Sequence, residues 1–192
     1  MPEPNEHRTH AFETPAKLRK WLKENHASET QLWLKIFKKD SGQKTISWKE
    51  AVIEALCWGW IDGIKKSFDD QAYLQRLTPR RKGSGWSRIN REHVEKLIAD
   101  GKMEEPGLVH VRAAKADGRW NAAYAPASKM TMPEDFLEAL ECNPKAKKYY
   151  STLSKTKLYS IAYRLRTAKK PETRKKHFDK FLGMLKNGEA PQ

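Results

Sequence analysis

Residues 56–91 constrain the fold of this 192-residue chain more than any other stretch, because they mix two kinds of surface. Three of the seven tryptophans lie here, Trp58, Trp60 and Trp86, together with the basic cluster 80–82. Large aromatic side chains usually occupy cores or contact surfaces, whereas a basic loop faces solvent or an anion. The segment must therefore hold the edge of a core close to an exposed loop.

The first half of the chain mixes strand and helix patterns. Residues 31–38 alternate in the manner of a strand with both faces partly apolar, and 60–68 and 72–78 read as two further strands. Asp69, Asp70 and Gln71 between them are typical of a hairpin turn. Helical spacing or capping residues predict helices over 15–25, 48–58, 90–100 and 106–116. We therefore expect an α+β fold, with a small three-stranded antiparallel sheet packed by helices.

Several helix starts carry capping residues. Thr14 precedes Pro15, an N-cap followed by proline at the first helical position. Ser47 and Glu50 have the spacing of a capping box, and so do Thr131 and Glu134. Ser87 or Asn90 is expected to cap the helix that ends near residue 100.

The last third of the chain is helical and basic. Helices are predicted over 133–142, 144–152, 155–168 and 171–187. Residues 143–192 hold 14 Lys/Arg against 3 Asp/Glu, so +11 of the net charge of +14 lies in this region. This asymmetry favours an acidic partner such as nucleic acid, an anionic membrane face or an acidic protein surface. The alternative is a solvated helical surface with no charged partner.

The patterns divide the chain into three parts. We expect a flexible N-terminus over 1–13, an α+β core domain over 14–125 and a basic helical region over 126–192. The irregular stretch 125–132 is the best candidate for a linker.

The sequence leads us to expect neither a targeting signal nor a disulfide. The N-terminus lacks an apolar signal core, and no stretch approaches the about 20 apolar residues that cross a bilayer. Cys57 and Cys142 lie far apart and suggest neither a disulfide framework nor a zinc site. The reducing cytoplasm is therefore the expected location, and direct contact with a porin is not expected.

The sequence gives little support for a metal site or for a catalytic nucleophile. None of the six histidines has a partner at the spacing of a zincin or a zinc finger, and there is no GxSxG motif. Cys57 has no histidine nearby in the sequence and follows an apolar helical run, which is typical of a buried thiol. We therefore predict no metal site, no cofactor and no catalytic residue.

The loop 78–91 is the strongest candidate for a binding site. Its basic cluster precedes two glycines, whose backbone N–H groups can approach a ligand, and then a helix N-terminus that favours anions. Trp86 could stack on a base or a sugar. A solvated basic loop with a buried Trp86 explains the sequence equally well. The candidate residues for an anion or partner are Arg80, Arg81, Lys82, Ser84, Trp86, Ser87, Arg88 and Asn90.

Asp62 is a secondary candidate. It lies in a predicted strand flanked by large aromatics, where a carboxylate needs a partner, and Arg76 or Arg80 on the neighbouring strand could supply one. A structural ion pair is the preferred interpretation. Proton transfer by Asp62 or His93 is the alternative.

Long segments of the chain resemble the YdeI/OmpD-associated family of bacterial proteins, also called bacteriocin-protection proteins. The matching segments cover 54–70, 73–103, 114–120 and 161–189. The resemblance implies a role in resistance to bacteriocins or antimicrobial peptides and an association with an outer-membrane porin, and it carries no catalytic residues. Many such peptides are cationic and would be repelled by a +14 chain, so an indirect cytoplasmic role in envelope stress fits better.

The sequence leaves three alternative hypotheses for the function. The first is a non-enzymatic cytoplasmic binding protein, linked to stress or antimicrobial resistance, that binds an anionic ligand or acidic protein surface through the loop and the basic tail. The second is nucleic-acid binding. The third is an enzyme acting on a small phosphorylated or carboxylated substrate.

Overall fold

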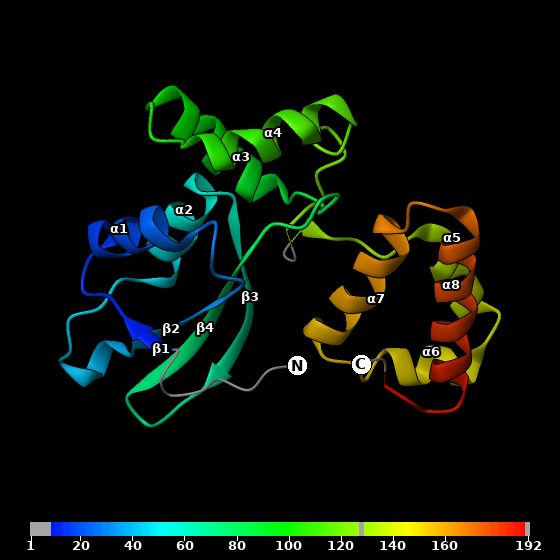
Figure 1. Ribbon diagram of the computed structural model, residues 1–192. Coiled ribbons are helices and arrows are strands. Elements are labelled where there is room, and N and C mark those ends of the chain that lie inside the picture. Colours follow the sequence, from blue (N-terminus) through cyan, green and yellow to red (C-terminus); the bar gives the residue numbers. More distant parts are fainter. Residues whose placement is uncertain (1–8, 127–128, 191–192) are drawn as a thin grey trace. The chain divides into compact units, whose positions relative to one another are not determined.

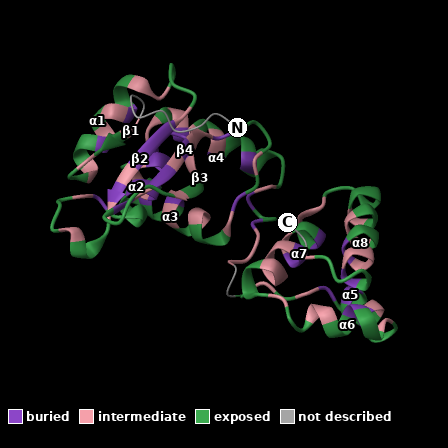
Figure 2. Cartoon of the chain, turned by 90° about the horizontal axis from the view of Figure 1, so that it is seen from below, coloured by how far each residue is buried: buried purple, intermediate pink, exposed green. Residues whose placement is uncertain are grey.

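The computed structural model describes residues 9–126 and 129–190 (Figure 1). The chain forms two compact units, Met1–Ala123 and Tyr124–Gln192. Each unit has its own cluster of buried apolar side chains (Figure 2). The predicted flexible N-terminus and the predicted linker each fall partly outside the described residues, at 1–8 and at 127–128 respectively.

The first unit contains a four-stranded sheet in the order β1-β2-β4-β3. The strands are β1 (Thr9–Ala11), β2 (Leu32–Phe37), β3 (Trp60–Ser67) and β4 (Ala72–Pro79). The mixed α+β fold is confirmed, but the prediction of three antiparallel strands is wrong in detail. β1 was missed, and it pairs with β2 in parallel. A three-residue strand shows no alternation of its own, and its pairing depends on residues more than twenty positions away.

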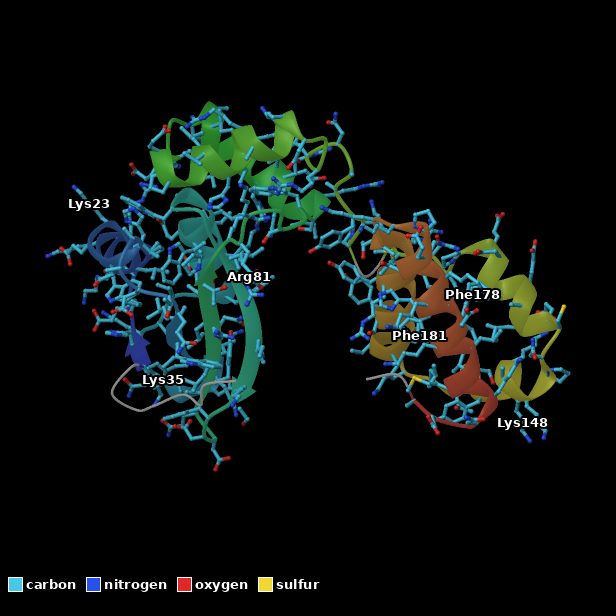
Figure 3. The ribbon with its side chains drawn as sticks, turned by 45° about the vertical axis from the view of Figure 1, so that its right-hand side comes forward. Lys23, Lys35, Arg81, Lys148, Phe178 and Phe181 are labelled. Carbon is cyan, nitrogen blue, oxygen red and sulfur yellow. The ribbon has the colours of Figure 1, made fainter. Side chains whose placement is uncertain are left out.

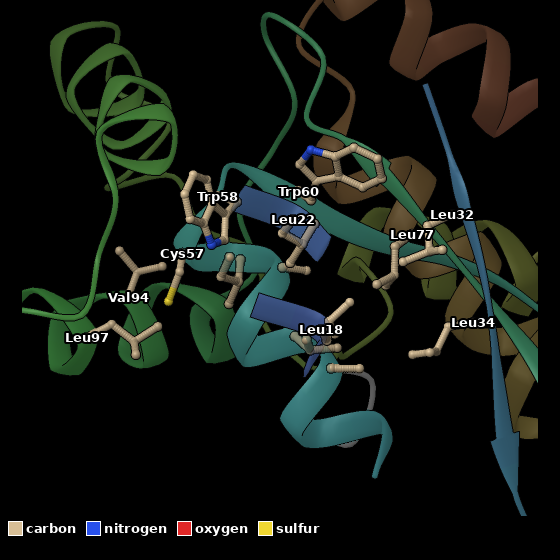
Figure 4. Close-up of a cluster of buried hydrophobic side chains, with 14 of the residues drawn as sticks. Leu18, Leu22, Leu32, Leu34, Cys57, Trp58, Trp60, Leu77, Val94 and Leu97 are labelled. Atoms are coloured by element: carbon tan, nitrogen blue, oxygen red, sulfur yellow. The ribbon is translucent and has the colours of Figure 1, made fainter. Parts of the chain in front are cut away.

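One face of the sheet carries the core of the first unit. Side chains alternate along a strand, so Leu32, Leu34 and Ile36 of β2 point to the same face. They join Leu18 and Leu22 of the helix that follows β1, and other buried side chains, in one cluster (Figure 4). The helices of this unit are α1 (Pro15–Asn25), α2 (Trp48–Cys57), α3 (Arg88–Ala99) and α4 (Glu105–Ala116), with a short 3-10 helix at Lys39–Ser41.

Local signals fix several boundaries as predicted. The hydroxyl groups of Thr14 and Ser87 cap α1 and α3, and Ser47 forms a capping box with Glu50 at the start of α2. In the hairpin turn, Oδ1 of Asp69 accepts hydrogen bonds from the backbone N–H groups of residues 71 and 72. The β3–β4 register shifts between Asp62 and Lys65, which marks a β-bulge.

The second unit is all helical, with α5 (Glu134–Glu141), α6 (Pro144–Tyr150), α7 (Lys155–Thr167) and α8 (Pro171–Lys186). Its core includes Phe136 of α5, Ile161 of α7 and Phe181 of α8, and Phe178 packs against it (Figure 3). The capping box predicted at Thr131 is wrong. Pro133 occupies the N-cap position without a side-chain bond, and Thr131 accepts hydrogen bonds from the Arg166 guanidinium instead.

Candidate anion-binding site

Arg80 and Trp86 of the basic loop belong to the core of the first unit. They are 5% and 2% exposed, and the Arg80 guanidinium lies 3.7 Å from the centroid of the Trp86 ring. Arg80 Nη2 donates to the carbonyl of Gly85 at 2.6 Å, and Trp120 packs edge-on against Trp86 with the ring centroids 4.9 Å apart. Their burial agrees with the alternative interpretation of a basic loop with a buried Trp86, and neither side chain offers an accessible surface to a ligand.

The loop beyond Arg80 is held by contacts from a distant segment. Gly83 adopts a positive φ of 85°, which allows the tight turn in which the Ser84 N–H donates to the Arg81 carbonyl at 3.0 Å. Arg119 Nη1 donates to the Ser84 carbonyl at 2.7 Å. The turn thus leaves Arg81 and Lys82 exposed beyond the end of β4, where Figure 3 shows Arg81.

Arg81 lines a cavity of about 570 Å³, within the range of about 300–1,000 Å³ that is typical of ligand sites. Two other predicted residues, Arg76 and Ser84, line the same cavity. Its remaining wall is His26, Ala27, Ser28, Glu29, Thr30, Ile61, Thr78 and Pro79. The cavity therefore combines two guanidinium groups with several hydroxyl groups and a single carboxylate.

Arg76 of β4 is the second arginine that lines the cavity. It pairs with Trp33 in the β2–β4 register, so it points away from the face that carries the core. Its Nε donates to Gln31 Oε1 at 2.9 Å, which orients the guanidinium of this half-buried side chain.

The segment 26–30, between α1 and β2, forms the opposite wall, and sequence reasoning missed it. Trp60 Nε1 donates to the His26 carbonyl at 3.3 Å, and the His26 ring lies 4.7 Å from the Trp58 ring. Trp58 and Trp60 thus hold this wall in place through their contacts with His26. Nothing in the local sequence signals that contact.

The other predicted residues of the loop lie outside the cavity. Ser87 Oγ accepts from the Asn90 N–H at 3.1 Å as a helix cap, and Arg88 Nε donates to the Ala123 carbonyl at 3.4 Å. His93 is half-buried on α3, where burial and then the nearby positive charge of Lys49 lower its pKa. The structure therefore brings together only three of the predicted residues at this cavity.

Asp62 points to the core face of the sheet, opposite Leu77 in the β3–β4 register. Burial raises the pKa of its carboxyl group, while the hydrogen bond from Trp48 and the charge of Arg80 act in the opposite direction. Of the two predicted partners, Arg76 is wrong, because that side chain lies on the other face and bonds to Gln31, whereas Arg80 acts on the carboxyl group through its charge. Trp48 Nε1 instead donates to Asp62 Oδ2 at 3.2 Å.

Groups that could hold a metal ion or act as a thiol nucleophile were sought among the described residues. Within residues 9–126 and 129–190, no three His, Cys, Asp or Glu side chains are grouped so as to hold a metal ion. Cys57 is fully buried, and burial raises the pKa of its thiol, which disfavours the nucleophilic thiolate. In the same described ranges, no helix has both the length and the apolar character needed to cross a membrane.

Fold and cavity together define a two-unit α+β protein with a basic, hydroxyl-rich pocket on its first unit. Residues 10–110, more than half of the chain, match the family model described as Domain of unknown function (DUF8412), and the chain belongs to this family. Residues 129–188 match a second model, described as Bacteriocin-protection, YdeI or OmpD-Associated, which confirms the predicted resemblance. The predicted segments 54–70 and 73–103 lie in the region of the first model. No curated protein and no solved structure matches the chain.

Proposed function

We propose that the protein is a non-enzymatic binding protein for a small anionic molecule carrying a phosphate or carboxylate group, held in the cavity between Arg76 and Arg81. One observation carries the proposal: Arg76 and Arg81 line one cavity of ligand size together with the hydroxyl-bearing residues Ser28, Thr30, Thr78 and Ser84. Guanidinium groups bind carboxylate and phosphate oxygens in a bidentate fashion, and hydroxyl groups donate to the remaining oxygens.

Arg80, the buried neighbour of Arg81, supports a preformed site. Arg81 follows directly on Arg80, whose backbone N–H donates to the Gly59 carbonyl at 2.9 Å and whose side chain packs on Trp86. The backbone that carries Arg81 is therefore held before a ligand arrives. A preformed site loses less conformational entropy on binding than a flexible loop would.

The biological setting of the proposal is a cytoplasmic role in stress or antimicrobial resistance. Its support is the description of the family that residues 129–188 match, together with the net charge of +14. A chain of this charge would repel cationic peptides, so we propose that it acts indirectly, by binding an anionic metabolite.

The charge of the second unit favours nucleic-acid binding as a second candidate function. The exposed lysines of α6 and α8 are Lys145, Lys147, Lys148, Lys175, Lys176, Lys180 and Lys186. Carboxylates contact two of them, since Glu141 pairs with Lys147 and Asp179 with Lys175. Such binding would weaken steeply as salt rises, because each phosphate contact releases counterions.

A thermal-shift series at constant ionic strength tests the proposed function. Inorganic phosphate, pyrophosphate, citrate and a sugar phosphate are compared with chloride, first on the wild-type protein and then on Arg76→Gln. The proposal expects at least one of these anions to stabilise the wild-type protein and to lose most of that effect in the variant. The proposal would be contradicted if the melting temperature of the wild-type protein were the same in all four anions as in chloride.

A further inference from the structure

A second cavity lies on the opposite face of the β3–β4 hairpin. Its volume is about 410 Å³, and its lining consists of Trp48, Asp62, Lys65, Tyr73 and Gln75. The registers place Asp62 opposite Leu77, and Gln75 opposite both Leu34 and Lys65, all on the face that carries the core. Arg76 and Thr78 of the first cavity alternate with these residues and point the other way.

Trp48 gives this cavity an accessible aromatic surface. It is the first residue of α2 and is 48% exposed, which is unusual for a tryptophan in a chain whose other large aromatics are mostly buried. Its indole is nevertheless fixed, because Nε1 donates to Asp62 Oδ2 at 3.2 Å. The capping box of Ser47 and Glu50 fixes the backbone on its N-terminal side. A ring that is both exposed and held in place is suited to stacking against a ligand.

The charges of the cavity argue for a neutral ligand. Asp62 supplies a carboxylate, and Lys65 supplies an ammonium group that lies 3.9 Å from the centroid of the Tyr73 ring. Asp62 would repel an anion and Lys65 would repel a cation. Both groups hydrogen bond well with hydroxyl groups, the carboxylate as acceptor and the ammonium as donor.

The geometry points to a carbohydrate site, and we propose that this cavity binds a neutral sugar ring stacked on Trp48, with its hydroxyl groups bonded to Asp62 and Lys65. Gln75 forms the floor. It is 3% exposed, and its Nε2 donates to the carbonyls of Gly63 and Ile64 in the β-bulge, at 3.1 and 3.4 Å. The bulge therefore lets Lys65, beyond Asp62, take its place on the cavity face of β3. This proposal is independent of the anion cavity, which lies on the other face.

Nuclear magnetic resonance titration of the full chain tests the proposal. The probes are methyl glucoside, cellobiose, lactose and N-acetylglucosamine, with gluconate as an anionic counterpart and choline as a cationic one. We expect at least one neutral sugar to shift the Trp48 indole N–H and the Lys65 amide saturably at millimolar concentration. Gluconate and choline should bind more weakly than that sugar.

Variants separate a sugar site from a general effect of sugars on the protein. Trp48→Ala should weaken binding by about tenfold or more, Trp48→Phe should retain part of it, and Asp62→Asn should weaken it severalfold. Phe68→Ala removes another exposed aromatic, 41% exposed and outside the cavity lining, and should leave the affinity unchanged. The proposal is overturned if no neutral sugar gives a saturable shift, or if Trp48→Ala and Phe68→Ala titrate alike.

Discussion

The guanidinium of Arg80 stacks on the indole of Trp86 at 3.7 Å, while the next residue, Arg81, is exposed and lines the cavity of about 570 Å³. Two adjacent arginines of one basic cluster thus have different roles. Arg80 stabilises the fold, and Arg81 is available to a ligand. Changes at Arg80 are therefore expected to alter stability, and changes at Arg81 to alter binding.

Replacing Arg80 with alanine should destabilise the first unit by about 2 kcal/mol or more, because a desolvated cation–π contact and a charged hydrogen bond to Gly85 are lost together. Urea unfolding followed by tryptophan fluorescence measures this directly, since all seven tryptophans lie in the first unit. Arg81→Ala is the matched control and should change the free energy of unfolding by no more than about 0.5 kcal/mol. Equal losses in the two variants would show that Arg80 is not structural.

Asp62 should make the stability of the first unit depend on acid pH. Burial raises the pKa of its carboxyl group above the ordinary value of 3.8, so the folded chain holds this proton more tightly than the unfolded chain. The contribution of Asp62 is therefore most favourable below the ordinary pKa and falls as pH rises through the folded pKa.

Asp62→Asn removes this titration. Its free energy of unfolding relative to wild type should rise with pH across the acidic window and then level off, as measured by urea unfolding at a series of pH values. Asp70→Asn, at an exposed position of the hairpin turn, serves as control. A flat difference between Asp62→Asn and wild type would contradict the direction of the shift.

Gly107 should tolerate no side chain. A Cβ there would lie 2.4 Å from the Cys57 carbonyl oxygen and 2.8 Å from that of Leu56, so α4 packs directly on the end of α2. Gly107→Ala should cost about 1–3 kcal/mol by overpacking. Gly183→Ala, in α8 where a Cβ meets nothing within 4 Å, should instead stabilise the second unit by about 0.5–1 kcal/mol. Thermal unfolding followed by circular dichroism compares the two, and destabilisation by both changes would refute the contrast.

The capping box at the start of α2 should stabilise the first unit by about 1 kcal/mol, since Ser47 Oγ accepts from the Glu50 N–H and the Glu50 carboxylate accepts from the Ser47 N–H. Ser47→Ala removes the first of these bonds, and urea unfolding measures the loss. Ser41→Ala, outside any α-helix, should have a much smaller effect. No loss in Ser47→Ala would show that the cap contributes little.

The features that the sequence predicts well are local. Thr14, Ser47 and Ser87 cap helices through atoms three residues away, and Asp69 closes its turn through the next three residues. Such interactions are encoded within one short window. The prediction failed at Thr131 for the opposite reason, since its oxygen atoms bond to Arg166, 35 residues away.

The candidate site was only partly predictable, because its walls come from distant segments. Arg81 and Ser84 were accessible to sequence reasoning as parts of a basic, glycine-containing loop. The wall 26–30 and the contact of Arg119 with the Ser84 carbonyl were not. The burial of Arg80 and Trp86 likewise depends on Trp120. Trp58, Trp60, Arg80 and Trp86, all within residues 56–91, are thus buried parts of the first unit.

The most direct test of the central claim compares Arg81→Ala with Lys82→Ala in calorimetric titrations with the anion that gives the largest thermal shift. Both residues are exposed and each change removes one positive charge, but only Arg81 lines the cavity. The account predicts a loss of affinity of about tenfold or more for Arg81→Ala, the value of one charged hydrogen-bonded contact, and less than about twofold for Lys82→Ala. Equal effects of the two changes would mean that the anion responds to net charge alone, and would contradict a site at Arg76 and Arg81.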